Sequence, residues 1–114
     1  MSRPTSYTVF MLVKTTDAWL ALPPSGRFEF LGAEIRPLLE RHPAVTMRFF
    51  DAEAFSARAT DIVLWQTTDL DAYQSIVEGL RETKFWGAYF EVLDIFPTVE
   101  NRYATHYDVK PLGG

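Results

Sequence analysis

Residues 45–67 read VTMRFFDAEAFSARATDIVLWQT, a stretch with two strand-like ends and a short connection between them. Its two ends, residues 45–51 and 61–67, are rich in β-branched and aromatic side chains, which favour strands. The connection over residues 52–60 is too short for the crossover helix that parallel strands need. The two strands are therefore predicted to pair as an antiparallel hairpin.

A strand and a helix are predicted before this hairpin. Residues 7–14, YTVFMLVK, carry apolar side chains on both faces, as a central strand does. Thr16 or Asp17 is expected to cap a short helical turn that the following prolines end. Steps of three and four then define a helical stripe: Phe28, Leu31, Ile35, Leu38 and His42. Pro37 is expected to kink this helix near its last turns, and Pro43 to end it.

A second helix, a fourth strand and a short terminal helix are predicted after the hairpin. Thr68 or Asp69 is expected to cap a helix whose apolar positions follow helical spacing: Leu70, Tyr73, Ile76, Val77 and Leu80. Residues 89–96, YFEVLDIF, form the predicted strand, which Pro97 is expected to end. Thr98 is then expected to cap the terminal helix.

The resulting order is β-α-β-β-α-β with an extra C-terminal helix, which is the ferredoxin-like α+β order. It predicts one four-stranded antiparallel sheet in a single domain over residues 1–114, with an ordered core of about 7–108 and loose tails. Right-handed crossovers place both long helices on one face of the sheet and leave the other face bare.

Alternation along the strands sorts their side chains between these two faces. The set expected under the helices is Val9, Met11, Val13, Val45, Met47, Phe49, Val63, Trp65, Phe90, Val92 and Phe96. The set expected on the bare face is Thr8, Phe10, Leu12, Thr46, Arg48, Phe50, Ile62, Leu64, Gln66, Glu91, Leu93 and Ile95. So large an apolar patch is unusual on a monomer, so we predict a homodimer that pairs these faces. The alternative is that the C-terminal helix folds back over part of the bare face.

Composition excludes several classes of function. The 114 residues include no cysteine, which excludes disulfides, thiolate metal sites and a cysteine nucleophile, and is compatible with the predicted cytoplasmic location. The net charge of −4 and the absence of a Lys/Arg run argue against nucleic-acid binding. The apolar stretch near the N-terminus is too short for a membrane span, so no membrane partner is predicted.

Several separate stretches of the chain carry a family resemblance: YTVFMLVKTT, WLALPP, RFFDAEAF, ETKFWGAYFEV and PTVEN. Together they resemble darcynin, a family of small bacterial proteins, over nearly the whole chain from Tyr7 to about Leu112. The resemblance implies no established function and brings no catalytic residues with it.

A broader resemblance, in strand order and apolar sheet face, is to the dimeric α+β barrels. That group includes cofactor-independent quinone-forming monooxygenases, muconolactone isomerases, polyketide cyclases and haem-handling enzymes. It implies a small-molecule pocket between the sheet and its own helices. In this chain the ligand-binding candidates for such a pocket are aromatic: Trp19, Phe28, Trp65, Trp86 and Tyr89. They could stack a flat ligand, or they could be ordinary core.

The catalytic candidates are Arg48, Asp51 and His42. Paired carboxylates around the hairpin can share acid and base roles where burial separates their pKa values, and an arginine can hold an enolate or carboxylate. His42 could be a base, an axial ligand for haem, or a favourable charge at a helix C-terminus. The alternative for the acids, Asp51, Glu53 and Asp61, is exposed ion pairs with arginines at a hairpin end.

No metal site and no cofactor are predicted. His42 and His106 are the two histidines, and neither belongs to an H-x-H or H-x-x-E spacing. Nucleotide-binding and serine-hydrolase motifs are also missing from the sequence. Two functions stay open: a cofactor-independent enzyme for a small hydrophobic or aromatic metabolite, of monooxygenase, isomerase or cyclase type, and a non-catalytic homodimeric binding module.

Overall fold

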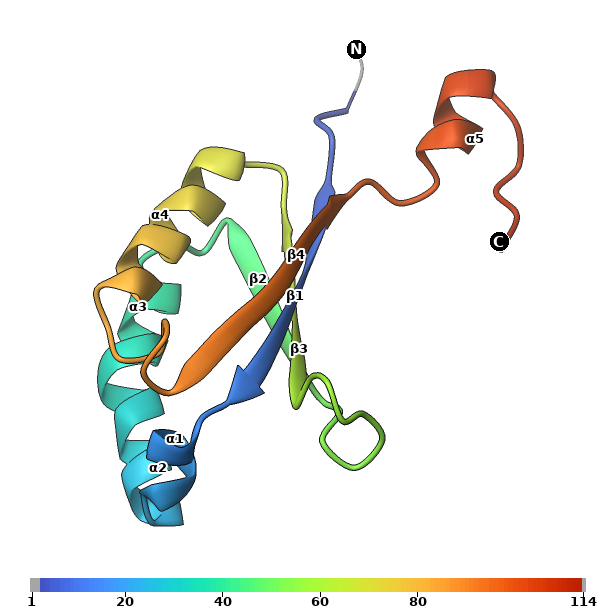
Figure 1. The fold of residues 1–114 in the computed structure, drawn as a ribbon. Coiled ribbons are helices and arrows are strands. Elements are labelled where there is room, and N and C mark those ends of the chain that lie inside the picture. Colours follow the sequence, from blue (N-terminus) through green and yellow to red (C-terminus); the bar gives the residue numbers. More distant parts are fainter. Residues whose placement is uncertain (1–2, 114) are drawn as a thin grey trace.

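A computed structural model describes residues 3–113 of the chain. Its sheet has the antiparallel strand order β2-β3-β1-β4, built from β1 (Tyr7–Thr15), β2 (Val45–Asp51), β3 (Asp61–Thr67) and β4 (Phe90–Thr98). The helices are α1 (Asp17–Ala21), α2 (Pro24–Phe30), α3 (Arg36–Glu40), α4 (Leu70–Arg81) and α5 (Arg102–Tyr107), with a π-helical turn over Leu31–Ile35. The predicted ferredoxin-like α+β fold is confirmed, and the long helices cover one face of the sheet (Figure 1).

The core lies between the sheet and these helices. Every second residue of β3 is buried, and the inward positions include Val63 and Trp65. Met11 of β1 and Ile76 and Leu80 of α4 complete the centre of this cluster. Burying one such side chain stabilises the fold by about 1.5–3 kcal/mol, which explains why the alternating apolar residues place this face of the sheet against the helices.

Side-chain caps begin two of the helices, as predicted. The Thr16 side chain accepts a hydrogen bond from Trp19 N at the start of α1, and the Asp69 side chain accepts one from Ala72 N at the start of α4. The irregularity expected from Pro37 is a π-turn just before that residue, and the helix continues as α3. The wider turn accommodates a residue that cannot donate a backbone hydrogen bond and whose ring crowds the preceding turn.

A β-bulge in β4 corrects the predicted face assignment. Leu12 pairs with Asp94 whereas Val13 pairs with Val92, so Leu93 is an extra residue. Beyond the bulge the two faces exchange. Ile95 therefore packs against the core, not on the bare face, and Phe96 points away from the helices, not under them.

The prediction that Pro97 ends the fourth strand was wrong. β4 is an edge strand and runs on to Thr98, whose hydroxyl donates to Thr8 O at 2.6 Å. Proline is tolerated at an edge because no further strand needs its missing N–H. Asn101, not Thr98, is the N-cap of α5, and it adopts the left-handed conformation at φ 51°.

The sheet face opposite the helices is called the open face. Its apolar members are Phe10, Leu12, Phe50, Ile62, Leu64 and Phe96, which share one side through their pairing. Within residues 3–113 no helix covers it, and α5 stands off beyond the end of β4 (Figure 1). The alternative in which the C-terminal helix folds back over this face is therefore not what the structure shows. None of the described helices has the length and hydropathy needed to cross a bilayer.

Gly79 permits the close packing of α4 on α3. A Cβ added there would lie 2.5 Å from Leu38 Cδ1, and Leu38 is itself buried in the core. We expect Gly79→Val to lower the free energy of unfolding by about 2–3 kcal/mol through overpacking. Chemical denaturation would measure this change in the free energy of unfolding. The matched control is Gly32→Val, where an added Cβ meets nothing within 4 Å, and an equal loss there would contradict the explanation.

Candidate functional site

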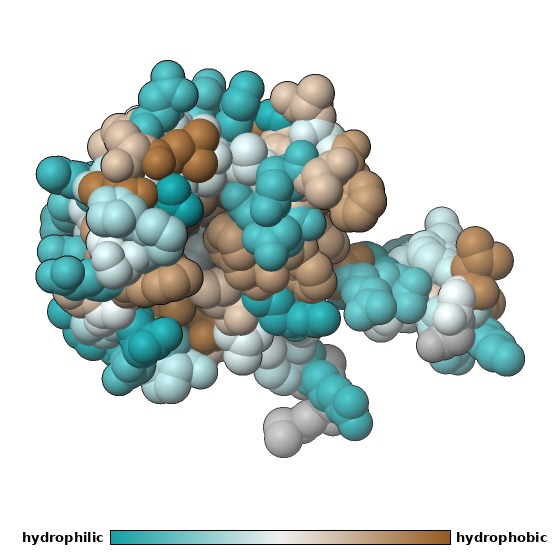
Figure 2. All heavy atoms as spheres, turned by 90° about the horizontal axis from the view of Figure 1, so that it is seen from below, coloured by the Kyte–Doolittle hydropathy of each residue, from teal (hydrophilic) through white to brown (hydrophobic). Residues whose placement is uncertain are grey.

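A cavity of about 720 Å³ lies between the helix-covered face of the sheet and the helices. Its aromatic lining residues are Trp19, Phe28, Phe49, Trp65, Phe85 and Phe90. The volume is in the range of small-molecule sites, which are typically about 300–1,000 Å³ and mainly apolar. Figure 2 looks at the molecule from the end that carries the β2–β3 connection and shows hydrophobic side chains between hydrophilic ones there.

Aromatic packing fixes one wall of the cavity. The Trp19 ring centroid lies 5.0 Å from that of Phe90, and Phe90 stacks on Phe85 at 4.6 Å. Arg27 ties α2 to α1, because its Nε donates to Trp19 O at 3.3 Å and its Nη2 to Leu20 O at 3.1 Å. This wall is therefore pre-formed.

The rim of the cavity is open to solvent. Phe28 is 71% exposed on α2, and Phe49 is also exposed, although it points to the helix side of β2. The expectation that Phe49 packs under the helices is corrected, because β2 is an edge strand and the cavity lies between it and the helical layer. Two rings at the mouth are thus free to contact a ligand.

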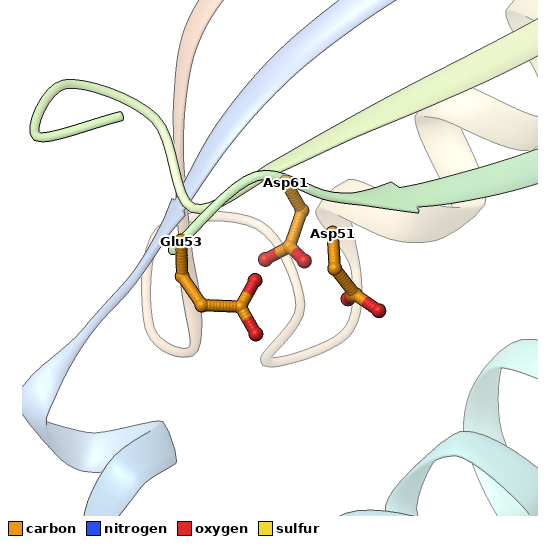
Figure 3. A group of neighbouring side chains, drawn as sticks. All are labelled: Asp51, Glu53 and Asp61. Carbon is orange, nitrogen blue, oxygen red and sulfur yellow. The ribbon is translucent and has the colours of Figure 1, made fainter. Parts of the chain in front are cut away.

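Three carboxylates meet at one end of the cavity. Asp51 and Asp61 face each other in the β2–β3 register, and Glu53 follows in the connection. One ligand oxygen from each lies within 4.8 Å of the others, and the side chains project from the same side of the hairpin (Figure 3). The Thr60 hydroxyl donates to Asp61 Oδ2 at 2.7 Å and accepts from Thr15 N at 2.9 Å, which fixes Asp61.

The carboxylates differ in burial and therefore in acidity. Asp61 is only 5% exposed, whereas Asp51 and Glu53 are exposed. Burial raises the pKa of Asp61 to about 6; the Thr60 hydrogen bond opposes this rise, and the neighbouring Asp51 and Glu53 add to it. A carboxyl with this pKa can take up or release a proton near neutral pH. The same three oxygens are also hard ligands of the kind that divalent cations prefer.

Only some of the predicted ligand-binding residues line the cavity. Trp19, Phe28 and Trp65 do, but Trp86 and Tyr89 lie outside the lining. Tyr89 packs on the Trp19 and Phe30 rings, with centroids 5.4 Å and 4.9 Å away. Trp86 is packed against the core with the Arg81 guanidinium 5.8 Å from its ring.

The predicted catalytic residues are not brought together. Asp51 lines the cavity, whereas Arg48 is on the open face, 4.9 Å above the Phe50 ring. His42 lines a separate groove between α3 and α4. Arg58 of the β2–β3 connection forms an exposed ion pair with Asp94 at 3.6 Å, and such pairs contribute little.

Phe85 and Phe90 were not among the predicted site residues, and Asp61 was considered only as one of the acids around the hairpin. Phe85 and Phe90 form the aromatic wall, and Asp61 is the buried carboxyl. The signal for Asp61 was present in the sequence: it shares the inward register of Val63 and Trp65, where a charged residue is unusual. Two acids directly opposite in a hairpin also repel each other, which costs stability and suggests a function.

Comparison with known proteins places the chain among relatives of unassigned function. Residues 2–114 match the family model described as darcynin, domain of unknown function. A darcynin homolog of Granulibacter bethesdensis is 50% identical over 101 residues, covering 88% of this chain and 82% of the relative. A homolog of Streptomyces avermitilis is 45% identical, covering 92% and 88%, and darcynin 1 of Acinetobacter baumannii is 35% identical, covering 76% and 98%.

Solved structures resemble the fold at low sequence identity. Chlorite dismutase from Candidatus Nitrospira defluvii in complex with imidazole has a TM-score of 0.71 and 17% identity, over 86% of this chain and 41% of that one. A mutant of the same enzyme gives a TM-score of 0.70, also at 17% identity, over 89% and 42%. The chain thus spans less than half the length of these structures, and the likeness concerns the fold alone.

Proposed function

The chain belongs to the darcynin family, a domain of unknown function, and we propose that it is an enzyme that transfers a proton on a small hydrophobic or aromatic metabolite. The observation that carries this proposal is a cavity with an aromatic wall and a buried carboxyl, Asp61, at one end. Apolar walls select a flat apolar body, and a few polar groups orient it.

Asp61 is the proposed general base. Its raised pKa of about 6 leaves it mostly ionised at neutral pH, and still basic enough to remove a proton next to a carbonyl or from a phenol. The same carboxylic acid can return the proton at another atom of the substrate, as an isomerase or cyclase requires. Arg36 lines the cavity and can stabilise the negative charge that forms on the substrate oxygen.

A homodimer through the open face is part of this proposal. Phe10, Leu64 and Phe96 lie side by side across three strands, so their burial by a second copy removes a continuous apolar patch from water. Burial contributes about 25 cal/mol per Å² before the cost of association. The second candidate function, a non-catalytic homodimeric binding module, is favoured by the same face and makes no use of Asp61.

A ligand screen tests the cavity. We expect phenolic or quinone-like compounds to raise the melting temperature, because a ligand that binds only the folded state stabilises it. Phe28→Ala should raise the dissociation constant of such a compound about 3- to 10-fold, which is the contribution of one aromatic contact. Calorimetric titration measures this change. Its matched control is Phe55→Ala, since Phe55 is 93% exposed and outside the cavity lining.

Two results would contradict the assignment. One is the absence of stabilisation by any compound in a screen that includes phenolics, quinones and haem. The other is an equal loss of affinity in Phe28→Ala and Phe55→Ala, because binding would then not depend on the rim of this cavity.

A further inference from the structure

The C-terminal arm, residues 99–113, stands apart from the body of the molecule (Figure 1) and has hydrogen bonds of its own. Asn101 and Asp108 both adopt the left-handed conformation and bracket α5, and Val109 N donates to Ala104 O at 3.0 Å. Leu112 N donates to the Tyr103 hydroxyl and folds the end of the arm back on the helix. The arm therefore has a built shape of its own.

The arm carries apolar side chains that the chain does not bury. Tyr107 is 70% exposed and Leu112 95% exposed, and Tyr103 and Val109 are also exposed. Because of the arm, the radius of gyration is 16.2 Å, whereas a compact chain of this length has about 13 Å. An ordered projection that exposes rings and aliphatic groups is typical of a contact surface.

The arm projects on the side of the sheet that the helices leave open (Figure 1). In Figure 1 the long helices lie on one side of the sheet, and α5 lies on the other side, beyond the end of β4. Figure 2 shows the arm separated from the body in the same direction. A second copy packed on the open face would occupy the space beside the arm.

The area of the open face also favours a second copy of the chain as the partner of the arm. Four strands about 4.8 Å apart and about seven residues long cover only roughly 450 Å² as a flat area. A stable interface buries about 800 Å² on each partner. A flat area understates the accessible area of a side-chain surface, so the sheet face alone lies near the lower limit for a stable dimer, and the arm provides further apolar surface next to it.

We infer that the C-terminal arm of each copy packs against the body of a second copy of this chain, with Tyr107 and Leu112 as its apolar contacts. The arm and the open face together then form one two-fold interface, in which each copy gives an arm and receives one. Because this inference rests on the proposed dimer, the experiment must separate the dimer from the exchange of arms.

Photo-crosslinking of the full chain distinguishes a dimer that exchanges its arms from a dimer that does not. A benzophenone side chain replaces Tyr107 in a mixture of isotopically labelled and unlabelled copies, and mass spectrometry identifies linked peptides. We expect links from Tyr107 to join labelled with unlabelled chains. The matched control replaces Phe28, which is equally exposed at 71% but lies on the helix side, and should give no such links.

Sedimentation of the full-length double variant Tyr107→Asp, Leu112→Asp gives a second readout. We expect its dimer dissociation constant to rise about tenfold or more, as for loss of apolar contacts inside an interface. If the wild-type chain sediments as a dimer but Tyr107 links stay within one chain, the arm inference fails and the proposed dimer stands. If the wild-type chain is a monomer at micromolar concentration, both fail.

Discussion

Replacing Leu64 with arginine is expected to convert the proposed dimer to a monomer at micromolar concentration. Leu64 lies on the open face, paired with Phe10 of β1 on one side and Arg48 of β2 on the other. A guanidinium buried there without a partner costs about 3–5 kcal/mol, or more than 100-fold in the dissociation constant. Sedimentation velocity at several concentrations measures the change.

The fold itself should survive this substitution, because Leu64 points away from the helix-covered core. Circular dichroism and a cooperative melt of Leu64→Arg would confirm that only association is lost. The control is Ala33→Arg, an exposed position of the helical layer, which should sediment as the wild-type chain does. A dimer of wild-type strength in Leu64→Arg would contradict the assignment of the open face as the interface.

Local patterns predicted most of the fold correctly. β2 and β3 begin and end at the predicted residues, since their boundaries depend on short-range signals in residues 45–67. The caps Thr16 and Asp69 were among the predicted candidates for the same reason. Each of these features depends on residues within a few positions along the chain.

Features that depend on distant residues were predicted less well. The bulge at Leu93 follows from the pairing of β4 with β1, and nothing in the sequence around it identifies the extra residue. The continuation of β4 through Pro97 depends on β4 being an edge, which the order of all the strands decides. Both are properties of the assembled sheet.

In the candidate site, too, features that depend on distant residues were predicted less well than local ones. Trp19, Phe28 and Trp65 were predicted as ligand contacts from the resemblance to barrels with a pocket between the sheet and its helices, and all three line the cavity. Tyr89 was misplaced because its ring packs on Trp19 and Phe30 outside the cavity, a contact between distant residues that the sequence pattern does not show. The arrangement of three carboxylates required the register of the hairpin and the path of its connection.

Asp61→Asn is expected to make the protein more stable at neutral pH while removing its proposed activity. In the folded chain the pKa of Asp61 is about 6, compared with 3.8 without the fold. The folded state therefore binds the proton more tightly, and this contribution to stability is present below about pH 4 and is lost as the pH rises through about 6. Because Asp51 and Glu53 are exposed, solvent screens their contribution to the raised pKa, so at pH 7 the gain from asparagine should be about 1–2 kcal/mol.

Denaturant unfolding of both proteins from pH 4 to pH 8 tests this sign. The difference in unfolding free energy should be near zero at pH 4 and grow to its full value by about pH 7, because asparagine does not titrate. Asparagine can keep the acceptor for the Thr60 hydroxyl, so the local geometry is retained. Turnover of any substrate found in the screen should fall at least 100-fold, the usual contribution of a general base.

Glu53→Gln is the matched control, because Glu53 belongs to the same cluster but is exposed. It should change stability by less than about 0.5 kcal/mol, as surface substitutions usually do, and should leave most of the turnover. If Asp61→Asn is more stable than the wild-type chain but inactive, the buried carboxyl lowers the stability of the fold and is needed for catalysis. If Asp61→Asn is instead less stable than the wild-type chain at pH 7, Asp61 serves the structure of the hairpin and the non-catalytic binding module becomes the better assignment.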